Sequence, residues 1–302
     1  MSVEPPRTDT PARARLAAAL LAWGRPRPLV PVGLADELRQ VLRHGAQQLP
    51  SASTVTVTAG RPIAPGSGAA APFVHDRANV RGALTQAAVE RDLLDAHRGT
   101  TAVVVAAVWD EAASRAPGDP RSRSWWLNHL PRPQAEDLRA ELVDLLDGFR
   151  EVWPALPTSG VVVRPSRTVH VDVLAGRVSL RGRIGPRIDS VRVDDRARGL
   201  LLDLRTSRPR PDHDRRRLRD LALLETLATD RPPFRWASLH LTDGRAEVED
   251  LDPEVLRVAA RSVAERFRLA DGASVRSAGQ RARSVVAPRA DGMSHRGGTM
   301  PS

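Results

Sequence analysis

The sequence predicts an α/β protein with a helical N-terminal part and a mixed sheet in its second half. Before Val161 the apolar residues recur at helical spacing, most clearly over Pro133–Trp153, where leucines form one stripe. From Val161 onward apolar and polar residues alternate, which is typical of strands. From Pro133 the predicted elements follow the order α-β-β-β-α-β-α, which indicates an α/β core.

The N-terminal part is expected to be helices around one short strand. A helix is predicted over Leu34–Leu42, and Gly45 and Pro50 are expected to close it. The alternating Thr54–Thr58 predicts a strand, and the Gly-, Ala- and Pro-rich Gly60–Pro72 predicts a loop. Further helices are predicted over Ala12–Trp23, Val80–Ala96, Thr101–Ala116 and Ser122–Leu130.

The second half is expected to hold the sheet. Val161–Ile184 predicts two strands joined by a hairpin turn at Ala175-Gly176, and Gly199–Thr206 is typical of a fully buried strand. Pro253 is expected to open a last amphipathic helix that ends near Leu269. Between these lie a predicted helix and two predicted strands, over Leu218–Leu227, Phe234–Leu241 and Ala246–Asp250.

These patterns divide the chain into four parts. Residues 1–11 are expected to be a disordered N-terminus and 12–132 a helical part, whereas 133–270 form the α/β core and 271–302 a disordered basic tail. The chain contains no run of 18 apolar residues and no secretory signal, so we expect no membrane span and a cytoplasmic location.

The composition favours a polyanionic partner, most simply nucleic acid. The formal net charge is +10, to which Asp271–Ser302 contributes +3 through five arginines and two aspartates. The alternative is that the excess charge is diffuse. Cysteine is absent, which excludes disulfides and thiolate catalysis, and the lack of lysine and tyrosine fits the nucleotide bias of a GC-rich genome.

The candidate chemistry lies on the strand Gly199–Thr206. Residues i and i+2 of a strand share a face, so Asp203 and Arg205 are expected to project together. Asp189, at the end of the preceding strand, could lie beside Asp203, and two converging carboxylates suit Mg²⁺. The alternative is that Asp203 and Arg205 form an ion pair at the end of a strand.

Three stretches occur in a characteristic order, namely "GPRID" ending at Asp189, "DLRTS" beginning at Asp203, and "LALLETL" beginning at Leu221. Together they resemble the PD-(D/E)XK nuclease superfamily, and more narrowly the RecB-like nuclease domains of actinobacterial type. Those domains have "DLKTG" and "YALLETL" at the corresponding places. The resemblance implies a restriction-endonuclease-like core, α-β-β-β-α-β with a mixed central sheet, over residues 133–270.

The resemblance also implies a site. Asp189 would be the first metal-binding acid and Asp203 the second, with Mg²⁺ or Mn²⁺ as the cofactor if the site is active. Arg205 stands where the family has its catalytic lysine, and arginine stabilises phosphate charge but effectively never acts as a base. The metal-supporting histidine falls at Gln86, and the family's Gln-x-x-x-Tyr pair falls at Arg217 and Leu221.

The sequence therefore predicts a DNA-associated protein of this superfamily with impaired or lost phosphodiester cleavage. Two alternatives stay open: an active metal-dependent DNA nuclease in repair, and a protein-interaction module that inherited the fold and binds a repair partner. Phosphate contacts are expected from a row of arginines at the start of a helix, which could instead be a solvated face: Arg215, Arg216, Arg217 and Arg219. Trp125-Trp126 could stack on bases or belong to the core.

Overall fold

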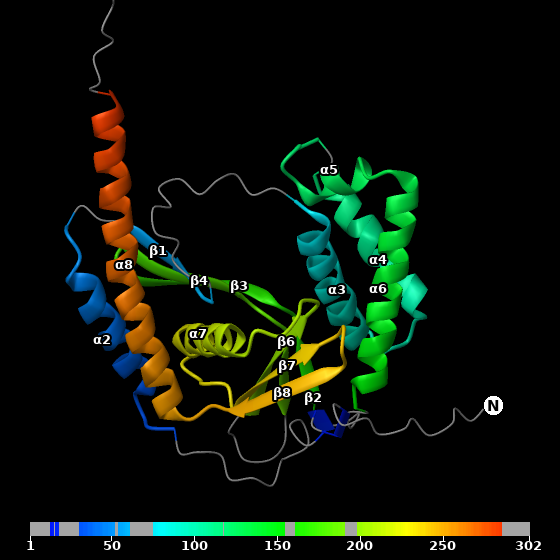
Figure 1. Ribbon diagram of the computed structural model, residues 1–302. Coiled ribbons are helices and arrows are strands. Elements are labelled where there is room, and N and C mark those ends of the chain that lie inside the picture. The colour runs from blue at the N-terminus through cyan, green and yellow to red at the C-terminus, as the bar shows by residue number, and fades with distance from the viewer. Residues whose placement is uncertain are drawn as a thin grey trace, which may run out of the picture.

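The computed structural model is a mixed α/β fold with two sheets, shown in Figure 1. It describes residues 13–14, 16–17, 30–51, 54–60, 75–116, 118–154, 161–190 and 198–285. The predicted disordered N-terminus, most of the helix predicted over Ala12–Trp23 and nearly all of the loop Gly60–Pro72 lie outside these residues. The α/β class predicted from the sequence is confirmed.

The strands form a small sheet and a larger one. Sheet A has the order β1-β4-β3, in which β1 runs parallel to β4 and β3 runs antiparallel to it. Sheet B has the order β2-β5-β6-β7-β8, and only its β6–β7 pair is parallel. The bounds are β1 Val55–Thr58, β2 Val161–Arg164, β3 Arg167–Leu174, β4 Val178–Ile184, β5 Arg187–Ser190, β6 Arg198–Arg205, β7 Arg235–His240 and β8 Arg245–Asp250.

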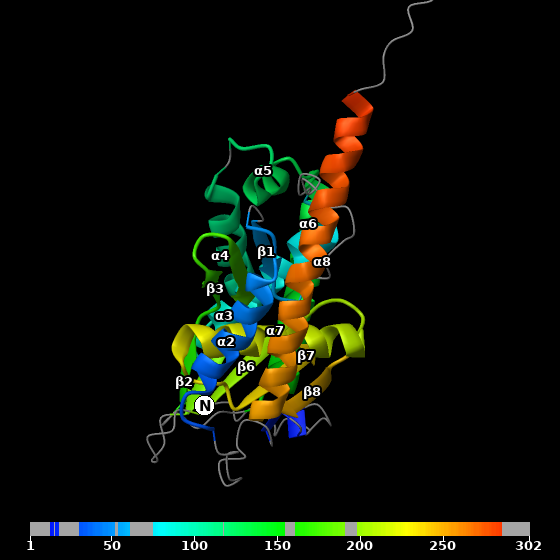
Figure 2. The same ribbon diagram turned by 90° about the vertical axis from the view of Figure 1, so that its left-hand side faces the viewer.

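The helices pack on both faces of sheet B. Helix α7 lies between the two sheets, α2 and α8 lie side by side, and α3 to α6 form a lobe on the other side of sheet B (Figures 1 and 2). The bounds are α2 Leu34–Gln47, α3 Arg77–Leu94, α4 Thr101–Ser114, α5 Arg123–Asn128, α6 Arg132–Val152, α7 Pro211–Thr229 and α8 Pro253–Val285.

Alternation along β6 decides which side chains face which core. Leu200 and Leu202 pack in the core shared with α3, α4 and α6, whereas Leu201 packs in the core shared with α7, α2 and α8. Because successive residues of a strand point to opposite faces, Asp203 and Arg205 lie on the same face as Leu201. The two polar residues are therefore directed towards α7.

The strands and helices of the second half largely follow the predictions. The hairpin turn at Ala175-Gly176 joins β3 to β4, and Gly176 has the positive φ of 68° that such a turn favours. Val161–Ile184 contains three strands rather than two, because β2 ends at Arg164 and pairs with β5 in the other sheet.

Two predicted helix ends are wrong. Gly45 lies inside α2, where a Cβ would overlap Ala264 of α8, so this glycine allows the two helices to approach closely rather than ending one of them. Helix α8 continues past Leu269 to Val285, so the first half of the predicted disordered tail is helical (Figure 2). Residues 286–302 lie outside the described chain.

Candidate functional site

Asp203 is buried at the centre of sheet B and is held by an arginine. It lies opposite Ser238 of the parallel neighbour β7. Arg217 of α7 donates from Nη1 to Asp203 Oδ1 at 2.6 Å, while Arg205 Nε lies 4.0 Å from Oδ2. The expected pairing of Asp203 with Arg205 is therefore present only as a long contact, and the close partner of Asp203 is Arg217.

Arg205 is directed to a different carboxylate. Its Nη2 donates to Oδ1 of Asp214, in the first turn of α7, at 2.5 Å. The backbone N–H of Arg210 donates to the other oxygen of Asp214 at 2.7 Å. Burial disfavours the charged form of Asp214, but the Arg210 N–H and the charge of Arg205 outweigh burial and lower the pKa of this carboxyl. Arg205 and Asp214 thus form a charged, hydrogen-bonded link between β6 and α7.

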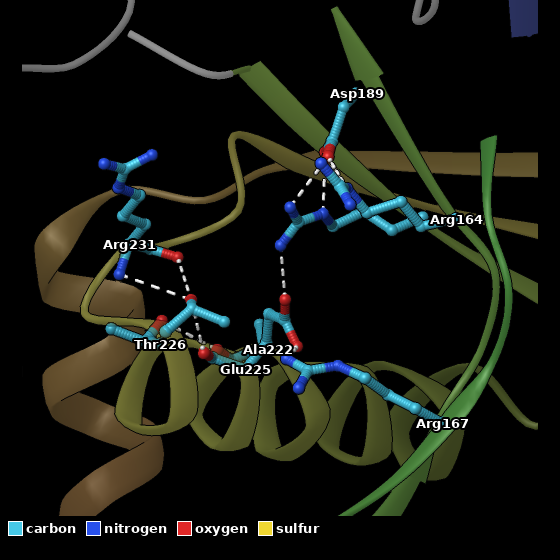
Figure 3. Close-up of polar contacts among 9 residues, drawn as sticks. Arg164, Arg167, Asp189, Ala222, Glu225, Thr226 and Arg231 are labelled. Carbon is cyan, nitrogen blue, oxygen red and sulfur yellow. Dashed lines mark hydrogen bonds and ion pairs between the residues drawn. The ribbon is translucent and has the colours of Figure 1, made fainter. Parts of the chain in front are cut away.

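Asp189 lies in a second group of ion pairs at the other end of α7, shown in Figure 3. Arg164 Nε donates to Asp189 Oδ2 at 2.6 Å, and Arg187 Nη2 donates to the same oxygen at 2.7 Å. Arg187 also contacts Glu225 of α7 at 2.5 Å, and Arg167 donates to the second oxygen of Glu225 at 2.7 Å. Burial lowers the pKa of Arg187, but Asp189 and Glu225 outweigh it and raise that pKa.

The register of the sheet keeps Asp189 and Asp203 apart. Asp189 lies opposite Gly199, which is four residues from Asp203 along β6. At about 3.3 Å per residue this separation is roughly 13 Å. Oxygens that share one Mg²⁺ each lie about 2.1 Å from the ion. The two acids predicted to form one metal site therefore do not converge.

The position opposite Asp203 is occupied by Gly185. Extending the β5–β6 pairing of Arg187 with Leu201 by two residues on each strand places Gly185 across from Asp203, and the Leu202 N–H donates to Pro186 O at 2.9 Å nearby. A Cβ at Gly185 would overlap the carbonyl oxygen of Leu202. No carboxylate can therefore replace this glycine without moving the backbone.

The donor set does not fit a divalent metal. Each predicted acid already has a guanidinium within 2.6 Å, and within the described part of the chain no three His, Asp or Glu side chains gather closely enough to hold an ion. Three buried atoms on this face of β6 and β7 have no hydrogen-bond partner among the described residues: Asp203 Oδ2, Ser238 Oγ and His240 Nε2. A buried water is the ordinary partner for such atoms.

Most of the arginines expected to contact phosphate are paired instead. Arg219 bonds Glu249, Arg215 lies 3.8 Å from the same carboxylate, and Arg217 holds Asp203. Arg216 is exposed, and its positive charge favours the ionised form of Asp220. Arg217 and Arg219 therefore join α7 to sheet B through close ion pairs.

Two family positions carry no charge. Leu221 is buried in the core between α7 and sheet A. Gln86 is half-buried on α3. Gly82, one turn before Gln86, lies close to Thr206 at the end of β6. Of the tryptophan pair, Trp126 packs against the helical core, whereas Trp125 stacks on His129 with ring centroids 3.9 Å apart. The prediction of a core role fits Trp126.

Several site residues could not be singled out from the sequence. Arg164, Arg187 and Glu225 depend on contacts between elements distant in the chain. The available signal was Glu225 in the middle of a run of leucines and alanines, because a carboxylate in an otherwise apolar helix segment requires a buried partner.

Comparison with known proteins gives little further information. No family model matches the chain, and no curated protein matches it. Among solved structures, one titled "Crystal structure of SSO0001" is 10% identical over 76% of this chain and 85% of that one, with a TM-score of 0.23. A likeness this weak carries no argument about fold or function. No helix in the described ranges is long and apolar enough to cross a membrane.

Proposed function

We propose that this protein is a DNA-associated relative of the PD-(D/E)XK nucleases in which ion pairs have replaced the metal site and cleavage has been lost. The observation that carries the proposal is the arginine on Asp203. A guanidinium 2.6 Å from the carboxylate supplies, from within the chain, the positive charge that a metal would bring.

The order of elements supports the nuclease ancestry. Helix α6 is followed by β2, β5, β6, α7 and β7, which is the expected α-β-β-β-α-β order once the β3–β4 hairpin is treated as an insertion. The three strands β2, β5 and β6 are antiparallel neighbours, and α7 connects β6 to its parallel neighbour β7. The resemblance of "DLRTS" and "LALLETL" falls on β6 and α7.

The chemistry of the residues argues against cleavage. Hydrolysis of a phosphodiester needs a metal-activated or base-activated water. Arg205 cannot accept a proton, Asp203 is bonded to Arg217, and Gly185 stands opposite Asp203 where a second acid would be needed. The polar groups of this site therefore hold β6, β7 and α7 together.

The association with DNA rests on charge. The chain carries a net charge of +10, and counterion release favours binding of such a surface to a phosphate backbone. The two alternatives differ in what they predict. An active repair nuclease would cleave DNA only with a divalent metal. A module that binds a repair partner would not bind DNA in a strongly salt-dependent way.

The test is incubation of end-labelled single- and double-stranded DNA with the full chain in Mg²⁺, in Mn²⁺ and in EDTA, with binding measured in parallel. We expect binding that weakens steeply with salt and no cleavage in either metal. Asp203→Ala serves as the control. Metal-dependent cleavage that Asp203→Ala abolishes would establish an active nuclease, and absence of DNA binding at low salt would overturn the association.

A further inference from the structure

The outer face of sheet A carries arginines that form no ion pair with any carboxylate in the described part of the chain. On β4, Arg181 and Arg183 are exposed and share this face, while Val178 and Leu180 point inward to the core. Arg181 lies opposite His170 of β3, and Arg183 lies opposite an exposed threonine. The two guanidinium-bearing positions are therefore about 7 Å apart along one strand.

The contacts of these arginines within the described residues include no direct ion pair. Arg183 donates to Ser166 Oγ at 2.7 Å, and Ser166 in turn bonds Glu90. Neither Arg181 nor Arg183 forms an ion pair with a described carboxylate. The acid on this face of β3 is Asp172, which lies opposite Ser179, two residues from Arg181 along β4.

Arg123 brings a third positive charge from the helical lobe. It is the first residue of α5 and is half-buried, and its Nε has no hydrogen-bond partner among the described residues. Burial lowers the pKa of Arg123, and the charges of Arg183 and Arg115 lower it further. An anion placed between α5 and β4 would offset both the burial and the repulsion between these arginines.

These arginines differ from those on α7. Arg215, Arg217 and Arg219 are engaged with Glu249 or Asp203. A phosphate that approached them would have to compete with a carboxylate already in place. At Arg123, Arg181 and Arg183 no such competition exists within the described residues.

We propose that Arg123, Arg181 and Arg183, with His170 beside them, form the surface that binds the phosphate backbone of nucleic acid. This surface, the β4–α5 surface, rests on the proposed association with DNA and assigns it a place away from Asp203. Guanidinium groups bind phosphate oxygens through two parallel donors, and the exposed hydroxyl of Thr168, opposite Arg183, supplies a further donor. An acidic protein is the other polyanion that such charges could attract.

The test compares two variants that lose the same charge. Arg123→Gln/Arg181→Gln/Arg183→Gln removes the β4–α5 surface, and the control Arg43→Gln/Arg98→Gln/Arg268→Gln removes three exposed arginines of α2, of the turn after α3 and of α8. Binding of labelled single- and double-stranded DNA is measured against salt, and thermal unfolding establishes that both variants are folded. Unlabelled polyglutamate serves as a competitor.

We expect the first variant to bind DNA roughly 10²-fold more weakly at about 0.1 M salt, with the slope of log K against log salt reduced by about 2 to 3. The control variant should stay within a few-fold of the unmodified chain. Equal binding by both variants would overturn the β4–α5 surface and leave the association with DNA standing. No binding by the unmodified chain would instead overturn the association itself. Competition by polyglutamate as effective as unlabelled DNA would overturn nucleic acid as the ligand.

Discussion

Replacing Arg217 by methionine removes the guanidinium from Asp203 and keeps an unbranched apolar stem. The stem matters because Arg217 packs across the backbone of Gly60, where a Cβ would overlap its side chain. After the substitution, Asp203 retains Arg205 Nε at 4.0 Å as its nearest charged partner. We therefore expect a loss of stability that comes from the charge pair and not from packing.

The magnitude follows from burial. Removing one partner of a fully buried ion pair costs about 3–5 kcal/mol. The Asp203 side chain is 9% exposed and that of Arg217 25% exposed, so solvent screens the pair in part, and Arg217→Met should lower the free energy of unfolding by about 2 kcal/mol. With an m-value of about 3 kcal/mol per molar urea, the midpoint should fall by roughly 0.7 M.

The assay is a double-mutant cycle in urea, using Arg217→Met, Asp203→Asn and the double variant. Each single variant leaves one buried polar group without its partner, whereas the double variant removes both charges together. We expect the double variant to be less destabilised than the sum of the two single variants by about the coupling energy. Additive effects, with a coupling near zero, would refute the view that Arg217 holds Asp203.

Two further predictions concern the close backbone contact at Gly185 and the stability of the fold at low pH. Gly185→Ala should lower the free energy of unfolding by about 2 kcal/mol or more, because its Cβ would overlap the Leu202 carbonyl oxygen. In the control Gly118→Ala the added Cβ meets open space, so the free energy of unfolding should change by less than about 0.5 kcal/mol. Equal effects of the two substitutions in urea unfolding would contradict the close contact at Gly185. Burial opposes ionisation of Asp92 and Asp214, but their partners lower both pKa values below the ordinary 3.8, so the unfolded state binds more protons in that range. The free energy of unfolding should therefore hold above about pH 4 and fall as the pH drops through the lowered pKa values. This fall should be smaller in Asp92→Asn. A pH profile of urea midpoints that is the same in Asp92→Asn and in the unmodified chain would contradict the contribution of Asp92.

The elements that the sequence predicted well are those whose pattern is local. The buried run Gly199–Thr206 and the leucines of Leu218–Leu227 are visible without knowing their neighbours, and they lie on β6 and α7. The turn at Ala175-Gly176 is likewise encoded in adjacent residues. Local signals were enough for the α/β class and for the face on which Asp203 and Arg205 project together.

The site could not be predicted because it depends on register. Pro186 follows β4 and precedes β5, so the chain leaves one sheet and enters the other between "GRI" and "RID". A shift of four residues along β6 then separates Asp189 from Asp203, although their order in the chain suggested convergence. Ion-pair choice is equally nonlocal, since Arg217 is fourteen residues from its partner and Arg164 is twenty-five from its own.

We propose that Arg217, and not a metal ion, neutralises Asp203. The most direct test titrates Mn²⁺ into the full chain and measures free Mn²⁺ by electron paramagnetic resonance, with Asp203→Asn as the matched variant. We expect the unmodified chain and Asp203→Asn to bind Mn²⁺ equally weakly, without a stoichiometric site. One tightly bound Mn²⁺ per chain that is lost in Asp203→Asn would overturn this role of Arg217 and restore a metal site at this carboxylate.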